Sequence, residues 1–265
     1  MVQKLQLGAR DVWLKRYERS PRPRRAMTRL WNFVAKELDA EPLRSPPRHE
    51  GEQAKLLELR RIGELSASGV RVPEVLGEGH RTLLLSDIGP SLSNRLKRAV
   101  DDSQVDRLVK KAAGEIAAVH GRGAYLGQAF PRNITVGDER IGFLDFEEDP
   151  LEVMPLRDAQ ARDWLLFAAG VSRHYAGRSD ALAGILGGVL PQAANDVTQE
   201  VRRLAERLGF LDRCTRYLGT RARAVGVAVL SLRQSFGKLA LLALLLVDYA
   251  TDGDMDTFNL LWNLL

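Results

Sequence analysis

The chain has 265 residues, of which 45% are hydrophobic and 28% are charged, a composition that supports a packed core and excludes wholesale disorder. Its single cysteine, Cys214, excludes an internal disulfide framework and a zinc site built on cysteines, so a reducing compartment is expected. The first residues, MVQKLQLGARDVW, contain no apolar run of signal-peptide length, and we therefore expect a cytoplasmic protein.

The net charge of +5 is concentrated near the N-terminus, where six arginines lie within residues 16–29. Such a cluster attracts polyanions, namely nucleic acid, anionic lipid headgroups or phosphorylated sugars, although a solvated basic loop is an equally good interpretation. Aromatic residues make up 6% of the chain and are not interleaved with these arginines, which argues against a stacking surface for single-stranded nucleic acid. Nucleic acid is therefore not the expected partner, and a peripheral contact with an anionic membrane stays open.

The N-terminal part of the chain predicts strands followed by helices. Residues 3–17 predict two short strands joined by a turn at Gly8. Residues 18–50 are rich in arginine and proline around one short amphipathic helix, TRLWNFVAKEL. Residues 50–67 have apolar side chains at a spacing of about 3.6 residues, which predicts a helix that ends at Gly69. The predicted apolar face of this helix consists of Leu56, Leu59, Ile62 and Leu65.

Further strands and helices are expected in the middle of the chain. VRVPEVLGEG and RTLLLSDIG predict two strands with a turn at Gly77 to Gly79. Residues 103–120 predict an amphipathic helix capped by Ser103. NITV and IGFLDF predict a pair of strands around the turn GDER.

The remainder is predicted to be mostly helical, in segments 158–175, 192–208 and 213–249. The last of these contains a strongly apolar stretch, 224–249, which charged residues interrupt. Because a membrane span needs about 20 consecutive apolar residues, a buried helix is the preferred interpretation and a membrane span is the alternative.

The strongest functional signal lies in residues 120–147, HGRGAYLGQAFPRNITVGDERIGFLDFE. Asn133 precedes Asp145 by twelve residues, and Asp145 opens an Asp-Phe-Glu triplet after an apolar run. In kinase-like enzymes a loop asparagine and the aspartate of an Asp-Phe-Gly triplet hold the magnesium ions of ATP. Amide and carboxylate oxygens are ligands that Mg²⁺ prefers. The pair therefore predicts a magnesium site, with a solvated acidic turn as the alternative.

Gln128 occupies the position five residues before Asn133, where kinases keep an aspartate as the general base. A glutamine cannot accept a proton as a carboxylate does, and general-base contributions are on the order of 10²–10⁴-fold. Its carbonyl oxygen can still orient a nucleophile. The sequence thus predicts a protein equipped to hold a metal–nucleotide but altered at the base position.

Residues 12–15, VWLK, resemble the Val-Ala-Ile-Lys strand of kinases, and Trp13 and Lys15 share one face of such a strand. Lys15 would then reach the α- and β-phosphates, while Trp13 would either stack on the base or block its pocket. A helix glutamate should pair with this lysine, and Glu58 is the preferred candidate, with Glu52 as the alternative. A surface lysine and exposed helix carboxylates are the plainer interpretations.

HGRGAYLGQAFPRNITV resembles the catalytic loop of bacterial lipopolysaccharide core kinases, the heptose and Kdo kinases, and of their RIO-like relatives. LKRY, GVRVPEVL and the hinge-like LLLSDIGPSL are similar to the same family, and the resemblance covers about residues 5–170. It implies ATP and Mg²⁺ as cofactors. It also implies that Asp163, in RDWLLF, braces the catalytic loop, and it makes Asp87 of the hinge-like segment a candidate nucleotide contact.

The resemblance further implies an α+β, protein kinase-like two-lobe fold. Residues 1–88 would form a small β-rich N-lobe with one main helix, and residues 89–265 a larger, mostly helical C-lobe in which 213–265 have no assigned role. The sequence departs from the family at Leu126, which replaces the loop histidine, at Gln128, and at Glu147, where the triplet usually has glycine.

Two functions follow from these departures. The preferred one is a degenerate kinase, a pseudokinase that regulates partner proteins. It would do so either by sensing nucleotide or as a nucleotide-free binding module. The alternative is an active ATP-dependent phosphotransferase that acts on a sugar or a lipid-linked envelope acceptor. Either protein is expected in the cytoplasm, with a peripheral contact at the inner membrane as a further expectation.

Overall fold

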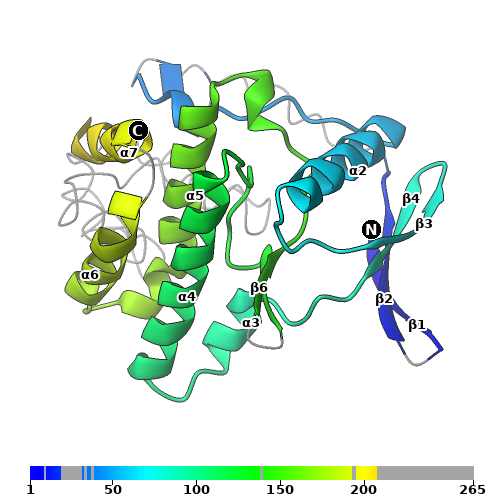
Figure 1. Ribbon diagram of the computed structural model, residues 1–265, viewed down its shortest axis with the longest axis horizontal. Coiled ribbons are helices and arrows are strands. Elements are labelled where there is room, and N and C mark those ends of the chain that lie inside the picture. Colours follow the sequence, from blue (N-terminus) through cyan, green and yellow to red (C-terminus); the bar gives the residue numbers. More distant parts are fainter. Residues whose placement is uncertain are drawn as a thin grey trace, which may run out of the picture. The chain divides into compact units, whose positions relative to one another are not determined.

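The computed structural model describes residues 1–8, 10–18, 32, 35–36, 39–137, 140–192 and 195–207, without the side chains of 195 and 205–207. It is an α+β structure with a four-stranded antiparallel sheet, a two-stranded sheet and several helices (Figure 1). The described residues divide into two compact units. One consists of Met1–Arg98 with Ala118–Asp163, and the other of residues 99–117 with 164–207. The expected lobe boundary at residue 88 stays a prediction.

The larger sheet has the strand order β1-β2-β4-β3, with every neighbouring pair antiparallel. β1 (Val2–Leu7) and β2 (Arg10–Arg16) form the predicted hairpin. Gly8 lies at its turn with φ +62°, a left-handed conformation that glycine adopts without a steric penalty. β1 is an edge strand with every residue exposed, whereas Val12 of β2 is buried in the sheet core. Strand β2 therefore carries side chains into the interior, as does β4 with Leu83 and Leu85.

The second hairpin consists of β3 (Val75–Gly79) and β4 (Thr82–Ser86), as predicted, but its turn is not at Gly77 to Gly79. Both glycines lie within β3, opposite Leu84 and Thr82 of β4. A Cβ on Gly79 would clash with the Thr82 hydroxyl, so glycine here allows a close approach between strands. The prediction of the turn was wrong because both glycines pair with β4 and neither has a left-handed conformation.

Helix α2 (Glu52–Ala67) confirms the predicted helix, and Gly69 ends it with φ +70°. The predicted apolar face was partly wrong, because Leu56 is 50% exposed while Leu57 is buried in its place. Charged side chains are also buried on the inner face of α2, among them Glu58. Lys55 joins the helix to β3, with its Nζ 2.7 Å from Glu78 and 3.0 Å from the Gly79 carbonyl oxygen. The helix thus presents polar groups to the sheet.

Helix α3 (Leu92–Lys97) is followed by the long helix α4 (Asp102–Gly121), which matches the helix predicted over 103–120. Its cap is not Ser103, however, because Asp101 accepts the backbone N–H of Gln104 at 2.7 Å. β5 (Ile134–Gly137) and β6 (Arg140–Phe143) then form the predicted strand pair.

The remaining described elements are helical, as predicted. α5 (Leu156–Val171) continues into the 3₁₀ turn η3 (Ser172–Tyr175), and α7 (Asn195–Arg207) falls within the predicted 192–208. α6 (Ser179–Val189) was not predicted, because its glycines weaken the helix signal while buried Leu182 and Leu186 hold it in place. Short 3₁₀ turns lie at η1 (Glu41–Leu43), η2 (Pro150–Glu152) and η4 (Leu190–Gln192).

Several expectations lie outside the described residues. These are most of the arginine-rich segment, the helix TRLWNFVAKEL except for three of its residues, Cys214, and everything predicted for 213–265, including the apolar stretch 224–249. Among the helices that are described, none combines the length and the apolar character needed to cross a bilayer.

Candidate functional site

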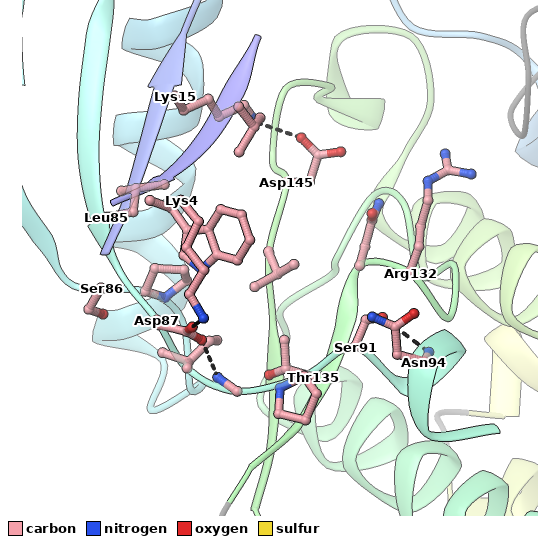
Figure 2. Close-up of a pocket in the computed structure, with 18 of the residues that line it drawn as sticks. Lys4, Lys15, Leu85, Ser86, Asp87, Ser91, Asn94, Arg132, Thr135 and Asp145 are labelled. Atoms are coloured by element: carbon pink, nitrogen blue, oxygen red, sulfur yellow. Dashed lines mark hydrogen bonds and ion pairs between the residues drawn. The ribbon is translucent and has the colours of Figure 1, made fainter. Parts of the chain in front are cut away.

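A pocket of about 700 Å³ lies in the unit formed by Met1–Arg98 and Ala118–Asp163 (Figure 2). Its walls come from strands β1, β2, β4 and β5, from helices α2 and α3, from the segment after β4, and from the residues next to β3, β5 and β6. The volume falls within the range typical of small-molecule sites. Six of the eight residues singled out from the sequence line it, namely Trp13, Lys15, Glu58, Asp87, Asn133 and Asp145.

Lys15 is the centre of an ionic cluster in this pocket. It projects inward from β2 and its side chain is only 9% exposed. Its Nζ lies 2.7 Å from Glu58 Oε2, 2.6 Å from Asp145 Oδ1 and 2.8 Å from Glu147 Oε1. Tyr17, two residues further along the chain, donates its hydroxyl hydrogen to Glu58 Oε2 at 2.7 Å. Of the two glutamates considered from the sequence, the structure pairs Glu58 with Lys15.

The alternative partner, Glu52, lies elsewhere. One of its carboxylate oxygens is 3.5 Å from Nδ1 of His80, and both side chains are largely exposed. Glu52 and Glu58 are six residues apart on α2, which places them about 240° apart around an ideal helix and therefore on different faces. Helix geometry therefore allows Glu58, and not Glu52, to contact Lys15.

The charges of this cluster shift the pKa values of its members. Burial lowers the pKa of the Lys15 ammonium, but the carboxylates of Asp145, Glu58 and Glu147 outweigh burial and hold that pKa well above its ordinary value. Burial raises the pKa of Glu58, and Lys15 offsets only part of this effect. Burial also raises the pKa of Asp145, yet Lys15 and the more distant arginines outweigh it, so that pKa lies below its ordinary value. Lys15 and Asp145 are therefore charged at neutral pH.

Asp145 is placed by the end of β6. It has φ +67°, a left-handed conformation that is uncommon for a residue other than glycine, and such conformations cluster at functional sites. The preceding residue, Leu144, donates its backbone N–H to the Asn133 carbonyl oxygen at 2.9 Å. This hydrogen bond ties the backbones that carry the two predicted metal ligands. The Asp145 side chain remains 39% exposed to the pocket, so its second oxygen is accessible to a ligand.

Asn133 is buried at the start of the β5 segment and lines the same pocket. Its Nδ2 donates to the backbone carbonyl oxygen of Gln128 at 3.2 Å, and its own N–H donates to the Phe130 carbonyl oxygen at 2.8 Å. The first of these bonds engages the nitrogen end of the amide, so that Oδ1 is the end suited to a cation. Asn133 and Asp145 thus face one pocket.

The loop before Asn133 is held by Asp163 of α5. Its Oδ2 accepts the backbone N–H of Leu126 at 2.7 Å, and its Oδ1 accepts that of Gly127 at 2.8 Å. His120 Nε2 lies 3.1 Å from Oδ2, and the side chains of His120 and Asp163 are fully buried. A charged carboxylate that receives several hydrogen bonds fixes the backbone around it. Asp163 thus holds the backbone of this loop at two N–H groups, and its role in a catalytic loop stays a prediction.

Gln128, like Asp163, does not line the pocket. It is half-buried, and its carbonyl oxygen accepts hydrogen bonds from the Phe130 N–H at 2.8 Å and from Asn133. The pocket is bordered by its neighbours in the loop, Arg132 and Asn133. In this arrangement Gln128 supports the asparagine through its backbone.

Trp13 and Asp87 form the other end of the pocket. Lys4 of β1 lies with its Nζ 5.6 Å from the centre of the Trp13 ring and 3.1 Å from Asp87 Oδ2. Asp87 Oδ1 accepts the Gly89 N–H at 2.8 Å. Burial raises the pKa of Asp87, but the hydrogen bonds from Gly89 and Lys4 lower it below its ordinary value. Trp13 is a wall of the pocket, and the open volume remains with the indole in place.

Sequence reasoning missed three charged residues of the pocket, Lys4, Arg132 and Glu147. Glu147 was noted only as a departure from the Asp-Phe-Gly pattern, whereas it contacts Lys15 directly. Lys4 lies on an exposed strand, and its alternation with Gln6 gave no functional signal. Arg132 precedes Asn133 in the chain, so its proximity to the predicted metal ligand was the one signal that could have found it.

Oxygens of Glu58, Asp145 and Glu147 all lie within 4.8 Å of one another, a spacing compatible with a metal ion. Nζ of Lys15 contacts all three carboxylates, so the ammonium is the cation of this cluster as it stands. Asp145 and Asn133 line the same pocket beside this cluster. Their carboxylate and amide oxygens are of the type that Mg²⁺ prefers, so these two residues are the candidates to hold a divalent cation there.

No family model matches the chain, and a search of curated proteins found no match either.

Proposed function

We propose that this chain is a kinase-like protein that binds a nucleoside triphosphate and Mg²⁺ in the pocket around Lys15. We further propose that it is a degenerate kinase that regulates a partner, because Gln128 replaces the aspartate that serves as general base. The proposed fold is the protein kinase-like two-lobe fold, divided near residue 88, and the proposed family is that of the lipopolysaccharide core kinases.

The observation that carries the proposal is the meeting of Lys15, Glu58 and Asp145 at one pocket. They come from β2, from α2 and from the segment after β6, and Lys15 Nζ lies 2.7 Å and 2.6 Å from the two carboxylates. An ammonium oriented by a buried glutamate is suited to contact phosphate oxygens. A carboxylate on its far side, next to an asparagine, is suited to hold the accompanying cation.

Each residue has a distinct task in this proposal. Lys15 binds phosphate oxygens, and Glu58 keeps its ammonium in place. Asp145 and Asn133 would hold Mg²⁺, which when bound neutralises the phosphate charge. Asp163 keeps the loop rigid, and Asp87 and Trp13 border the end of the pocket where the base would lie. Gln128 supplies no carboxylate, so proton removal from an acceptor is the step that is lost.

Thermal unfolding in the presence of Mg-ATP tests nucleotide binding. A ligand at 100 times its Kd stabilises the native state by about 2.7 kcal/mol, and the melting temperature should rise accordingly. Asp145→Ala should abolish the rise, whereas the matched control Asp180→Ala, an exposed residue of α6, should keep it. A melting temperature unaffected by millimolar Mg-ATP would contradict the proposal, as would an undiminished rise in Asp145→Ala.

The bracing of the loop favours a second candidate, an active phosphotransferase for a sugar or lipid-linked acceptor. Asp163 holds two backbone N–H groups of this loop, and such order is of use mainly when the loop orients a reacting group. ATP turnover by the wild-type protein, lost in Asp145→Ala, would favour this candidate. If the wild type is inactive and Gln128→Asp gains turnover, the base is the missing component and the degenerate kinase stands.

A further inference from the structure

Arg132 is a partly buried cation that makes no hydrogen bond or ion pair with the described residues. It is half-buried in the pocket wall, and within the described part of the chain it has neither a hydrogen bond nor an ion pair. The other arginines of the described residues that are not exposed each have at least one such contact, namely Arg44, Arg61, Arg71, Arg162, Arg178 and Arg203.

An unpaired guanidinium in such a place is unfavourable without a ligand. Arginine does not give up its proton in proteins, so the charge must be compensated by solvent or by an anion. Burial lowers the pKa of Arg132, which reports the loss of solvent around the guanidinium. Asp145 and Glu148 act on it electrostatically, but within the described residues no carboxylate oxygen reaches 4.0 Å from it.

The backbone and side-chain stem of Arg132 are nevertheless well positioned. Its guanidinium carbon lies 4.5 Å from the centre of the Phe130 ring, which leaves the N–H groups at the edge free to face a ligand. The neighbouring Pro131 carbonyl oxygen accepts the Ser93 N–H at 3.0 Å, and the Asn133 N–H bonds to Phe130. These hydrogen bonds fix the backbone on both sides of Arg132, and the contact with the Phe130 ring holds the guanidinium.

Its position relative to the proposed metal ligands points to the kind of anion. Figure 2 shows Lys15 and Arg132 on opposite sides of Asp145, with both cations bordering the same pocket. Two cations on either side of a carboxylate that would hold Mg²⁺ suit a chain of phosphates or two separate phosphate groups. A guanidinium matches a phosphate through two parallel hydrogen bonds, which an ammonium cannot provide.

We infer that Arg132 is a phosphate-binding residue of this pocket, and that it receives the phosphate oxyanion farthest from Lys15. This inference rests on the proposed function for the identity of the ligand, and it adds a recognition residue that the Asn133–Asp145 motif does not include. The phosphate has two possible sources with the same chemistry. It is either the terminal phosphate of the nucleotide or a phosphate on a second molecule bound beside a nucleoside diphosphate.

Calorimetric titration of the full-length protein tests the inference, with Mg-ATP, Mg-ADP, inorganic tripolyphosphate, and inorganic phosphate added in the presence of Mg-ADP. The variants are Arg132→Ala, Arg132→Lys and the matched control Arg95→Ala, an exposed arginine of α3. Loss of a charge-assisted hydrogen bond pair corresponds to a fall in affinity of about 10- to 100-fold.

Two results support the inference and identify the source. If Arg132→Ala loses affinity for Mg-ATP and tripolyphosphate but keeps that for Mg-ADP, the terminal phosphate of the nucleotide is the ligand. If nucleotide affinities stay unchanged while inorganic phosphate no longer binds beside Mg-ADP, a phosphorylated second molecule is the ligand. Arg132→Lys keeps the charge but loses the paired hydrogen bonds, and it should lose affinity for the same probe about 3- to 10-fold.

Other results overturn the inference or separate it from the proposed function. Wild-type affinity for every probe in Arg132→Ala and Arg132→Lys overturns it, and so does a wild-type protein that binds none of them. Tripolyphosphate binding that depends on Arg132, without any nucleotide binding, leaves the inference standing and contradicts the proposed function. A merely structural role predicts an unliganded melting temperature well below that of the wild type, whereas we expect a change within about 2 °C.

Discussion

Removing the ammonium of Lys15 should destabilise the protein more than removal of any exposed lysine. In Lys15→Met the buried carboxylate of Glu58, whose side chain is 2% exposed, loses its counterion and keeps only the hydrogen bond from Tyr17. Breaking a buried pair by removing one partner typically destabilises by about 3–5 kcal/mol. Asp145 and Glu147 are more than a third exposed, so solvent screens their loss and we assign them little of the effect.

A double-mutant cycle isolates the interaction between Lys15 and Glu58. Glu58→Gln alone should destabilise by about 1–2 kcal/mol, because Lys15 keeps two other carboxylates. In the double variant no buried carboxylate is left without a counterion, so its loss should fall short of the sum of the single losses by about 1–3 kcal/mol. The assay is urea unfolding followed by circular dichroism, with Lys110→Met, an exposed residue of α4, as the matched control. The control should change stability by no more than about 0.5 kcal/mol.

Two results would refute this reasoning. One is a loss below about 1 kcal/mol in Lys15→Met, which is the value for a surface ion pair. The other is additivity of the two single losses, which would mean that Lys15 and Glu58 do not depend on each other. Either result would remove the physical basis for an oriented phosphate-binding lysine.

Three further outcomes are expected, from the contacts of Glu147, Asp163 and Asp149. Glu147→Gln should raise the affinity for Mg-ATP about 3- to 10-fold in calorimetry, because Glu147 competes with phosphate for Lys15 at 2.8 Å, whereas the exposed control Glu74→Gln should not; an unchanged affinity would exclude this competition. Asp163→Asn should lower stability by about 3 kcal/mol or more, since its amide cannot accept all the hydrogen bonds that the carboxylate accepts, and wild-type stability in thermal unfolding would contradict the bracing role. Burial raises the pKa of Asp149, but hydrogen bonds from Arg60 and Tyr125 outweigh burial and hold that pKa below its ordinary value. The Asp149 carboxylate therefore stabilises the folded protein fully above its ordinary pKa near 3.8. This stabilisation is lost as the pH falls through the folded-state pKa. The difference between the urea midpoints at pH 7 and pH 3 should therefore be smaller in Asp149→Asn than in the wild type. An equal difference in the two proteins would refute this assignment of the pKa shift.

The members of the site that the sequence could predict are those with a strong local pattern. Asn133 and Asp145 flank a pair of short strands, and a tight hairpin necessarily brings residues just outside its ends close together. Lys15 lies within β2, and the alternation of side chains along the strand sets the face on which it lies. Fixed spacing and strand periodicity thus made it possible to predict from the sequence that these residues share one pocket.

Other members depend on tertiary packing that the sequence pattern does not contain. Glu147 meets Lys15 because the backbone turns at Asp145, where a left-handed φ of +67° redirects the chain. The choice between Glu52 and Glu58 required the rotational position of α2, and the prediction of its apolar face was itself off by one residue at Leu56. Positions that differ by one residue on a helix lie about 100° apart, so a small error of this kind moves a side chain to another face.

The errors in secondary structure have related causes. Gly77 and Gly79 were interpreted as a turn, although both pair with β4 and Gly79 allows β3 to approach Thr82 closely. Ser103 was interpreted as a cap because serine is favoured there, but Asp101 two residues earlier makes the capping hydrogen bond. The glycines of α6 concealed a helix that buried leucines stabilise. For the glycines, tertiary contacts overrode a local preference, whereas the cap was a choice between two neighbouring side chains.

Calorimetric titration of the wild-type protein with ATP, in the presence of Mg²⁺ and in the presence of a chelator, tests the central claim most directly. The claim is that Asp145 and Asn133 hold a divalent cation beside the phosphates that Lys15 binds. We expect saturable binding that requires Mg²⁺ and that Asp145→Asn and Asn133→Ala each weaken by at least about tenfold. Binding that is equally strong without Mg²⁺ or in both variants would contradict the claim, as would a protein that takes up no nucleotide at all.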